Sequence, residues 1–302
     1  MLLRSRRAAA AVVFGTGIAI SLSACGSDSL SSGGSSNTKT VASATVDSAL
    51  AGKLPEKIKT AKKIVVGTDA SYAPSEFLAA DGKTVQGFDV DLFKAVGQKF
   101  GVDVEFVPSS FDSIIGGVST GKYDIGVSSF TINDQRKQQV NMVSYYSAGT
   151  QWATQKGNPK NVSPDAACGL KVAVQTGTVQ EEEDLPKRQK ACKDAGKPAI
   201  AVQSYQGQDE ATAAVATGKA DAMLADSPVC AYAVLQSSGA LMTVGDVYDS
   251  APYGYVVPKD ETDFANAIVD ALKALKSDGT YDKVLEKWGV KSGGISDFAV
   301  NP

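Results

Sequence analysis

The stretch VEFVPSSFDSIIGGVSTGKYDIGV, residues 104–127, decides the fold of this 302-residue chain. Its two ends, residues 104–107 and 124–127, are short apolar runs typical of buried strands. Between them, residues 111–119 place apolar side chains at helical spacing, and Gly121 follows as a helix stop signal. A strand, a helix and a second strand in this order predict two parallel strands joined by a right-handed crossover.

The same alternation extends toward the N-terminus. Residues 64–66 favour a further strand, and residues 89–100 favour a helix with one apolar face that ends before Gly101. Asp89 and Asp91 suit the positive N-terminal end of this helix better than they suit a ligand site. The order strand, helix, strand, helix, strand predicts a parallel sheet flanked by helices, which is an α/β fold.

The pattern recurs in the second half of the chain. The phrase TGKYD at 120–124 resembles TGKAD at 217–221, and in both phrases a glycine ends a helix before a strand. The repetition predicts two similar α/β lobes. Further strands are predicted at residues 170–174, 200–202 and 222–224, and further helices at 179–192 and 209–217.

Polar and aromatic residues follow these strands. In open parallel sheets, ligands bind beyond the carboxyl ends of the strands, where loops and helix N-termini present free N–H groups. An arginine for an anion, aspartates for a cation and aromatic faces together favour a zwitterion with a modest side chain. The residues concerned are Asp69, Tyr72, Phe111, Ser128, Ser129, Thr131, Gln175, Thr176, Thr178 and Asp226, with Arg136 a few residues after Thr131.

Six phrases in chain order carry a family resemblance. They are GTDASYAP at 67–74, GFDVDL at 87–92, SSFT at 128–131 with Arg136, SYQGQD at 204–209, GTY at 279–281 and KWG at 287–289. From about residue 64 to residue 290 the chain resembles the polar amino-acid-binding proteins, which are the family 3 extracellular solute-binding proteins of ABC importers.

The resemblance implies a periplasmic-binding-protein-like α/β fold, with parallel-type sheets flanked by helices and two lobes joined by two hinge strands. Lobe 1 would comprise residues 60–149 plus 255–302, and lobe 2 residues 150–254. The chain would cross between the lobes near residues 148–150 and return near 253–255, and the lobes would close on the ligand.

The resemblance also implies how an L-amino acid is held. Arg136 would grip the α-carboxylate, because a guanidinium can form two parallel hydrogen bonds with a carboxylate. A backbone N–H near Ser129, the hydroxyl of Thr131 and the amide of Thr178 would complete this cradle. Asp226 would bind the α-ammonium group.

The ligand side chain would lie between Tyr72 and Phe111, and Asp69 would face its polar end. This aspartate favours a polar or cationic side chain. Ser75 replaces a usual phenylalanine of the family and Val179 replaces a frequent hydroxyl residue, so the identity of the amino acid stays open. The predicted ligand-binding set also contains Ser128, Thr176 and Gln180.

Each of these roles has a structural alternative. Arg136 could be a solvated surface residue, and Asp226 could cap the helix that follows it. Phe111 and Tyr72 could be core aromatics. Asp69 could form a local turn bond, which is common for an aspartate after a strand.

The chain contains no histidine, which excludes Ser-His-Asp and Cys-His catalysis and histidine-ligated zinc. We expect a binding protein with no catalytic residue, cofactor or metal. A lyase acting on a cyclic acid is a second hypothesis, with Asp69 or Glu76 as a carboxylate of shifted pKa. A membrane-tethered sensory or scaffold protein is a third. Arg136 together with Asp226 favours the first, because a substrate without an amine has no use for Asp226.

The N-terminus predicts export and a lipid anchor. Three arginines precede residues 8–20, an apolar stretch too short to span a bilayer stably. Leu-Ser-Ala-Cys at 22–25 looks like a lipobox, so residues 1–24 are predicted to be a lipoprotein signal peptide and Cys25 the lipidated first residue. Residues 25–59 are predicted to be a flexible tether, since they begin with a Ser- and Gly-rich run. A plain signal peptide with a chance cysteine is the alternative.

Charge and cysteine content fit an extracytoplasmic location on the cell membrane. Removal of the signal, with its three arginines and no acidic residue, would lower the formal net charge from −3 to −6, which argues against nucleic acid as a partner. We favour a Cys168–Cys192 disulfide over three free thiols, and we expect Cys230 to be buried in its apolar run. The expected partners are a free amino acid and the transmembrane subunits of an ABC permease, and the protein is expected to be a monomer.

Overall fold

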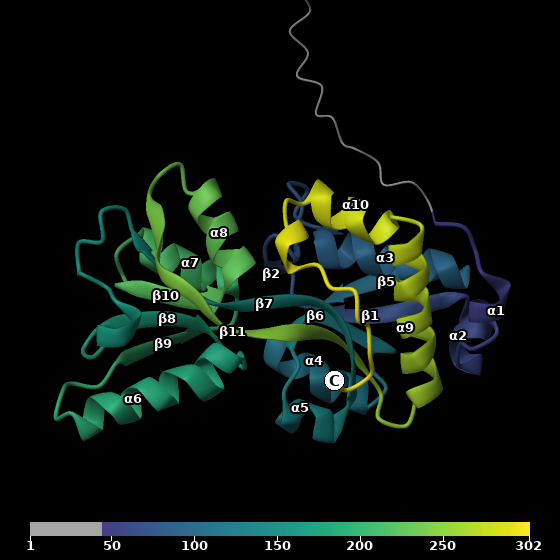
Figure 1. Ribbon diagram of the computed structural model, residues 1–302, viewed down its shortest axis with the longest axis horizontal. Helices are drawn as coiled ribbons and strands as arrows, with labels where there is room; N and C mark the ends of the chain where they lie inside the picture. The colour runs from purple at the N-terminus through teal and green to yellow at the C-terminus, as the bar shows by residue number, and fades with distance from the viewer. Residues whose placement is uncertain (1–43) are drawn as a thin grey trace, which may run out of the picture. The chain divides into compact units, whose positions relative to one another are not determined.

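A computed structural model describes residues 44–302 of the chain (Figure 1). The predicted signal peptide, Cys25 and the start of the predicted tether lie outside the described residues. Two short helices, α1 (Ser48–Ala51) and α2 (Glu56–Ala61), come first in the described part.

These helices show that the predicted tether is too long. Leu50, Leu54 and Ile58 are buried in the main hydrophobic cluster. Asp47 caps α1, because its carboxylate accepts hydrogen bonds from two backbone N–H groups of the helix. Burial of these apolar side chains, which stand at every fourth position, offsets the conformational entropy lost when the segment becomes ordered. A tether reaching residue 59 is therefore wrong: the folded body includes residues 48–61.

The main sheet contains eight strands in the spatial order β5-β1-β6-β11-β7-β10-β8-β9. A second, small sheet has the order β2-β3-β4, with strands Ser71–Tyr72, Glu76–Leu78 and Val85–Gln86. The main strands are β1 (Lys63–Thr68), β5 (Asp103–Pro108), β6 (Ile125–Thr131), β7 (Asn141–Gln155), β8 (Lys171–Gln175), β9 (Ala201–Tyr205), β10 (Ala222–Asp226) and β11 (Leu241–Val257).

The pairing divides the main sheet into two parallel groups. β1 pairs in parallel with β5 and β6, and β8 pairs in parallel with β9 and β10. The 15-residue β7 and the 17-residue β11 run antiparallel to each other and join the two groups, as Figure 1 shows. The predicted parallel pairs are thus confirmed, and two long strands connect them.

Helices cover both parallel groups. The predicted glycine stops are confirmed at Gly121 and Gly218, which adopt the left-handed φ of 76° just after α4 and α7. The predicted helix 179–192 begins instead as a π-helical turn, Gln180–Asp184, before α6. The helices are α3 (Phe88–Phe100), α4 (Phe111–Ser119), α5 (Asp134–Gln139), α6 (Leu185–Asp194), α7 (Gln208–Ala216), α8 (Ser227–Gln236), α9 (Thr262–Ser277) and α10 (Thr280–Lys287).

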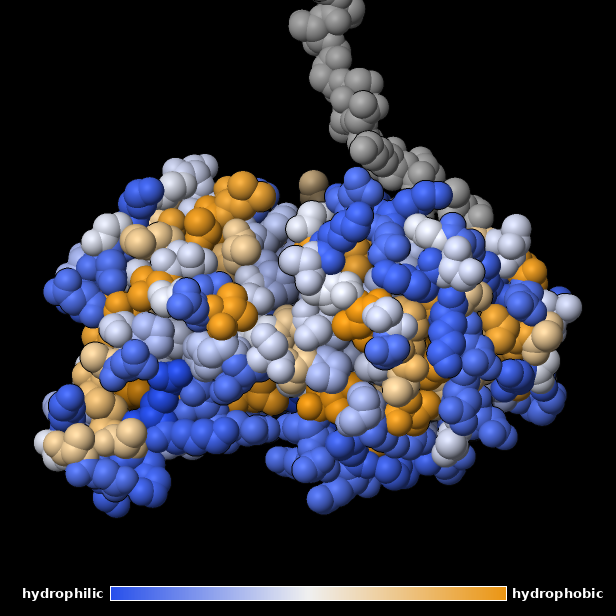
Figure 2. Space-filling model, viewed as in Figure 1, coloured by the Kyte–Doolittle hydropathy of each residue, from blue (hydrophilic) through white to orange (hydrophobic). Residues whose placement is uncertain are grey.

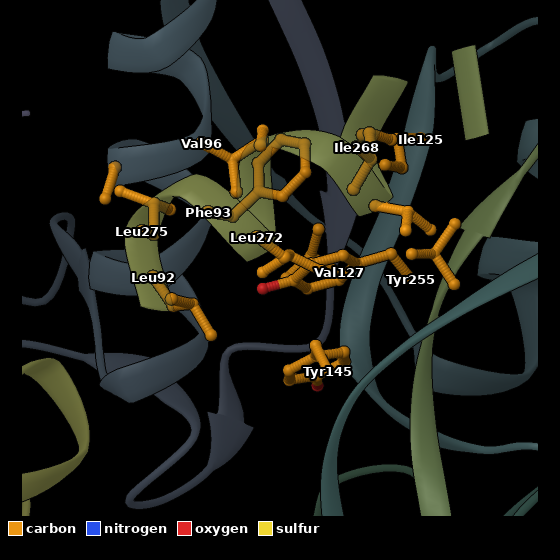
Figure 3. Close-up of a cluster of buried hydrophobic side chains, with 14 of the residues drawn as sticks. Leu92, Phe93, Val96, Ile125, Val127, Tyr145, Tyr255, Ile268, Leu272 and Leu275 are labelled. Atoms are coloured by element: carbon orange, nitrogen blue, oxygen red, sulfur yellow. The ribbon is translucent and has the colours of Figure 1, made fainter. Parts of the chain in front are cut away.

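We call the part built on β1–β6 and helices α1–α5, α9 and α10 lobe 1, and the part built on β8–β10, the turn between β8 and α6, and α6–α8 lobe 2. Lobe 1 contains the larger core. Leu92, Phe93 and Val96 of α3 pack with Ile268 and Leu272 of α9 next to the sheet (Figure 3). The last two helices of the chain therefore complete the lobe in which the chain begins.

Lobe 2 has two smaller clusters, one of them rich in alanine. A disulfide joins Cys168, just before β8, to Cys192 in α6, with the Cα atoms 5.6 Å apart, so the predicted pair is confirmed. Cys230 is fully buried, as expected, and forms no disulfide within residues 44–302.

Figure 2 shows hydrophilic residues over much of the visible face, with hydrophobic residues in scattered patches. Within residues 44–302, no helix is both long and apolar enough to span a membrane. The same part of the chain contains no cluster of three or more acidic or cysteine side chains arranged to hold a metal ion.

Candidate ligand-binding site

The predicted binding residues gather where strands of both lobes end. Asp69 follows β1, Arg136 lies on α5 shortly after β6, Thr176 follows β8 and Asp226 ends β10. Because parallel strands in each group end at the same sheet edge, residues far apart in sequence become neighbours here. All of Asp69, Arg136 and Asp226 are at most 5% exposed.

Arg136 is held between the lobes. Its Nη1 donates to the carbonyl of Thr131 in lobe 1 at 2.7 Å. Its Nη2 donates to the carbonyl of Gly177, which belongs to lobe 2, at 2.9 Å. The guanidinium carbon lies 5.5 Å from the ring centre of Phe111 and 5.4 Å from that of Phe130. These hydrogen bonds use two of its five N–H groups. Its burial rules out a solvated surface role and lowers its pKa.

Asp226 is the matching buried carboxylate in lobe 2. It accepts hydrogen bonds from the hydroxyls of Tyr72 at 2.8 Å and Tyr253 at 2.7 Å, and from the amide of Gln180 at 2.7 Å. Burial raises the pKa of Asp226, while these three donors and the charge of Arg136 lower it. Asp226 occupies the N-cap position of α8, yet its side chain forms no capping bond. The carboxylate therefore faces the site and not the helix.

Asp69 forms the local turn bonds that were the alternative to a ligand role. Its carboxylate accepts from the N–H and the hydroxyl of Ser71 and from the N–H of Phe111 at 3.1 Å. It also accepts from the amide of Gln175 in lobe 2 at 3.1 Å. Burial raises the pKa of Asp69. All four donors are neutral groups, so none of them compensates its charge.

Ser128 and Ser129 form the floor of the site in lobe 1. The Ser128 hydroxyl accepts from the N–H of Asp69 and donates to Glu76, both at 2.9 Å. The N–H and the hydroxyl of Ser129 donate to Asp89 at 3.0 and 3.2 Å. The N–H of Ser129 is therefore used by Asp89, and a backbone N–H near Ser129 as part of the carboxylate cradle stays a prediction.

The other predicted residues have mixed roles. Gln180 reaches Asp226 and also the Thr150 hydroxyl, at 3.1 Å. The Thr178 hydroxyl donates to the Gln175 carbonyl at 2.8 Å, and the Thr176 N–H donates to a carbonyl of β9 at 2.9 Å. The main-chain carbonyl of Thr131 accepts a hydrogen bond from the Arg136 guanidinium and so helps to position it.

The aromatic residues belong to the site and to the core at once. Phe111 stacks on Phe130, with ring centres 4.4 Å apart and planes at 19°. Tyr72, from lobe 1, packs in the alanine-rich cluster of lobe 2 while its hydroxyl binds Asp226. The structure therefore shows both rings packed in hydrophobic clusters beside Arg136 or Asp226, and their contact with the ligand side chain stays a prediction.

Two residues of the site were missed by the sequence reasoning. From the sequence, Tyr253 on β11 is only a residue of the predicted crossing, yet its hydroxyl donates to Asp226. Gln175 is a strand-end residue outside the predicted ligand-binding set, yet its amide donates to Asp69. Gln175 could have been predicted as a site residue because it ends a strand. Tyr253 could not, because its place at the site depends on the register of two long strands.

Asp89 and Asp91 are structural, as favoured. Asp91 accepts from the ammonium of Lys287 at 2.6 Å and from the indole N–H of Trp288 at 2.8 Å. Asp89 binds Ser129 and also the hydroxyl of Tyr145, at 2.6 Å.

A separate groove of about 610 Å³ lies on the side of β7 and α8, next to α10. Its lining includes Tyr232, Leu235 and Trp288 but none of the predicted ligand-binding residues. The groove therefore does not alter the location of the candidate site.

The arrangement defines a class of protein: a two-lobed α/β ligand-binding protein whose site lies between lobes that β7 and β11 connect. Comparison with known proteins gives the family. Residues 64–291 match the bacterial extracellular solute-binding proteins, family 3, and the chain belongs to this family.

Three similar proteins illustrate the family. Over 248 residues the chain is 34% identical to the arginine-binding protein ArgT of Corynebacterium glutamicum, covering 82% of this chain and 81% of that protein. An ancestral arginine-binding protein bound to arginine matches at 36% identity and a TM-score of 0.69, covering 75% of this chain and 98% of that one. The ancestral amino acid-binding protein AncCDT-1, a precursor of cyclohexadienyl dehydratase, matches at 37% identity and a TM-score of 0.68, covering 77% and 98%.

Proposed function

We propose that this chain captures an L-amino acid with a cationic side chain between its two lobes and delivers it to the permease of an ABC importer. The pairing of Arg136 in lobe 1 with Asp226 in lobe 2 carries the proposal. Their charges are complementary to the α-carboxylate and the α-ammonium group of an amino acid. Both side chains are 5% exposed, and a charged ligand group brought between them needs such partners.

Asp69 supports a cationic side chain on this ligand. It is a second buried carboxylate, and its hydrogen-bond partners are neutral donors from Ser71, Phe111 and Gln175. A ligand with an α-ammonium group and a second cation would compensate both Asp226 and Asp69. The arginine named in the descriptions of two similar proteins agrees with this charge pattern.

Isothermal titration calorimetry with a panel of amino acids tests this proposal. We expect L-arginine and L-lysine to bind more tightly than L-glutamine, and L-glutamate and D-arginine to bind least. Thermal unfolding gives a second readout, since a ligand at about 100 times its Kd adds about 2.7 kcal/mol to the free energy of unfolding. Equal affinity for L-glutamate and L-arginine would remove the cationic preference, and no binding of any L-amino acid would remove the proposal.

We further propose that the chain is a binding protein and not an enzyme. AncCDT-1 raises the enzyme hypothesis, since it is described as the precursor of a dehydratase. Asp226 argues against a substrate without an amine, because nothing in such a substrate would compensate this buried carboxylate. Prolonged incubation of each bound amino acid with the protein, followed by mass spectrometry, should return the ligand unchanged.

We propose that the lobes move about β7 and β11. Ala251 pairs with Ala148, and Tyr253 already packs with Tyr145 and Tyr146 in the core of lobe 1. We therefore place the second crossing before Tyr253, a few residues earlier than the sequence suggested. Small-angle scattering should show a smaller radius of gyration on addition of L-arginine, and an unchanged radius at saturation would contradict closure.

We propose that the protein is a monomer outside the cytoplasm, attached to the cell membrane through a lipid on Cys25. The Leu-Ser-Ala-Cys sequence at 22–25 supports this attachment. Cys25→Ser should leave unprocessed precursor or release the protein from membranes. Cys230→Ser is the matched control and should leave the membrane fraction unaltered. A Cys25→Ser variant of mature size in the membrane fraction would contradict the anchor.

A further inference from the structure

Two acidic side chains lie completely buried beneath the floor of the site. Glu76 is on β3 and Asp89 is in the first turn of α3, and both residues are 0% exposed. One oxygen of each carboxyl group, Oε2 of Glu76 and Oδ1 of Asp89, has no hydrogen-bond donor among the described residues. The two carboxyl groups also lie within hydrogen-bonding reach of each other. A buried acceptor left without a donor is costly, so a shared explanation for the two oxygens is needed.

The remaining oxygens of the pair are well supplied with donors. Oε1 of Glu76 accepts from the Ser128 hydroxyl at 2.9 Å. Oδ2 of Asp89 accepts from the N–H and the hydroxyl of Ser129 and from the Tyr145 hydroxyl at 2.6 Å. Tyr145 lies beside the aliphatic cluster of lobe 1 and stacks on Tyr255 with ring centres 4.0 Å apart (Figure 3).

No cation stands among the titratable groups that face the pair from the surrounding described elements. These groups are Asp69 after β1, Tyr145 and Tyr146 on β7, and Tyr255 on β11. Two ionised carboxylates in such surroundings would repel each other without compensation. A single proton between Oε2 of Glu76 and Oδ1 of Asp89 removes the repulsion and supplies the missing donor for both oxygens.

We propose that Glu76 is a positioning residue for ligand binding: its carboxyl group keeps a proton at neutral pH, donates it in a hydrogen bond to Oδ1 of Asp89, and thereby fixes the Ser128–Ser129 floor of the site. This inference rests on the proposed amino-acid binding. It assigns the proton to Glu76 because Asp89 already accepts three hydrogen bonds, which stabilise its ionised form.

The floor needs such support. Ser129 has φ +48°, a left-handed conformation that residues with a side chain rarely adopt, and its two bonds to Asp89 hold it there. Ser128 holds the N–H of Asp69. Two residues beyond Ser129, the Thr131 carbonyl accepts from Arg136. The acid pair is thus connected to both ends of the proposed ligand position.

The pKa values agree with this proton. Burial and the neighbouring Asp89 raise the pKa of Glu76 well above its ordinary value. Burial raises the pKa of Asp89 to about 6, against the donors that lower it. A group whose pKa is raised on folding stabilises the protein below its unfolded pKa, and the contribution is lost as the pH rises toward the folded pKa. In that window the unfolding equilibrium constant should rise about tenfold per pH unit for one proton.

Glu76→Gln tests the assignment, because an amide keeps a carbonyl for Ser128 and an N–H donor for Asp89 but cannot titrate. We expect this variant to bind L-arginine at pH 7 about as tightly as the unsubstituted protein. Its free energy of unfolding should decline less steeply with pH than that of the unsubstituted protein, because, of the described carboxyl groups near the site, only those of Asp69, Asp89 and Asp226 then keep a raised pKa. Glu76→Ala removes the donor and should weaken binding by at least about tenfold. Glu105→Gln, at a half-exposed carboxylate paired with Lys63, is the control and should keep the decline.

Infrared spectroscopy provides a direct readout. The unsubstituted protein at a pH above 7 should show the carbonyl stretch of one protonated carboxyl group, and Glu76→Gln should lack that band while Glu105→Gln keeps it. A missing band in the unsubstituted protein, or its persistence in Glu76→Gln, would overturn the inference. Two results with Glu76→Gln would also overturn it. These are a free energy of unfolding that declines with pH as in the unsubstituted protein, and binding of L-arginine as weak as in Glu76→Ala.

These measurements separate the two proposals. The infrared band and the pH dependence of unfolding are recorded without ligand, so they test the acid pair even if no amino acid binds. Conversely, tight binding of L-arginine without the band would remove the acid pair and leave the proposed function intact.

Discussion

The two lobes hold their parts of the site by different means. In lobe 1 buried carboxyl groups hold the floor of the candidate site, Glu76 at Ser128 and Asp89 at Ser129 and Tyr145, next to a large aromatic and aliphatic core. In lobe 2 the core is smaller and rich in alanine, and a disulfide connects α6 to the start of β8. The comparison suggests that lobe 1 supplies rigidity by packing, whereas lobe 2 needs a covalent link to reach comparable order.

The largest expected effect comes from removing either charge that the lobes present to each other. Arg136→Ala or Asp226→Ala would leave one ligand charge buried without a partner, at a cost of about 3–5 kcal/mol, or about two to three decades or more in Kd. Arg136→Lys should recover only part of this loss, because an ammonium cannot form two parallel bonds with a carboxylate. Calorimetry with L-arginine measures the loss.

Asp270→Ala is a suitable control for the first prediction, since this carboxylate pairs with Lys53 at the surface of lobe 1. It should leave the Kd unaltered. Near-normal affinity in Arg136→Ala or in Asp226→Ala would contradict the opposed-charge arrangement and the amino-acid proposal with it.

The next effect concerns the disulfide of lobe 2. The double substitution Cys168→Ser with Cys192→Ser should lower the free energy of unfolding by about 3 kcal/mol, because the link closes a loop of 24 residues in sequence separation. At temperatures well below its melting temperature, the variant should bind the ligand as tightly as the unsubstituted protein. Denaturant unfolding measures the change, and thiol counting on denatured, unreduced protein should find Cys230 alone reactive. Unaltered stability would show that lobe 2 does not depend on its covalent link.

A smaller effect should come from Asp69, whose charge the ligand side chain is proposed to compensate. Asp69→Asn should weaken the binding of L-arginine and L-lysine by about 1.5–3 kcal/mol, which is the contribution of a hydrogen bond to a charged group. The binding of L-glutamine should be weakened less. Competition experiments with the three ligands give the order of preference. An equal loss for all three would show that Asp69 acts only through its turn.

The smallest effect is expected at the rim, where the Asn133 amide of lobe 1 donates to Glu183 of lobe 2 at 2.8 Å. Glu183→Ala leaves the capping of α5 by Asn133 in place and should weaken binding by about 0.5–1 kcal/mol, mainly through faster dissociation. Stopped-flow fluorescence can resolve the dissociation rate. Glu286→Ala, at an exposed position of α10, is the control. A loss as large as that of Arg136→Ala would mean that rim contacts and not the opposed charges hold the lobes together.

Much of the fold could be predicted because its strands and helices have clear periodicity and glycine stops. Residues 111–119 form the predicted helix, and each predicted strand lies within two or three residues of an observed one. The helical start at residues 48–61 was hidden because it continues a polar, Ser-rich stretch, although the spacing of Leu50, Leu54 and Ile58 carried the signal.

The site was harder to predict in detail than in location. Sequence position could select Arg136, Asp226 and Asp69, since each follows a strand end. It could not show that the Ser129 N–H is used by Asp89, because that bond joins a strand end to a helix 40 residues away. The role of Tyr253 likewise depends on how two long strands are aligned, and register irregularities near this residue are not visible in the sequence.

The attachment of the chain's beginning to lobe 1 has a mechanical consequence. The N–H of Ala44 donates to the side chain of Gln98, and the N–H of Asp47 donates to the carbonyl of Lys99, so the described chain starts on the last turn of α3. Any pull transmitted along the preceding residues is therefore carried by lobe 1. Lobe 2 bears none of this load, so its proposed movement about β7 and β11 would leave the point of attachment in place.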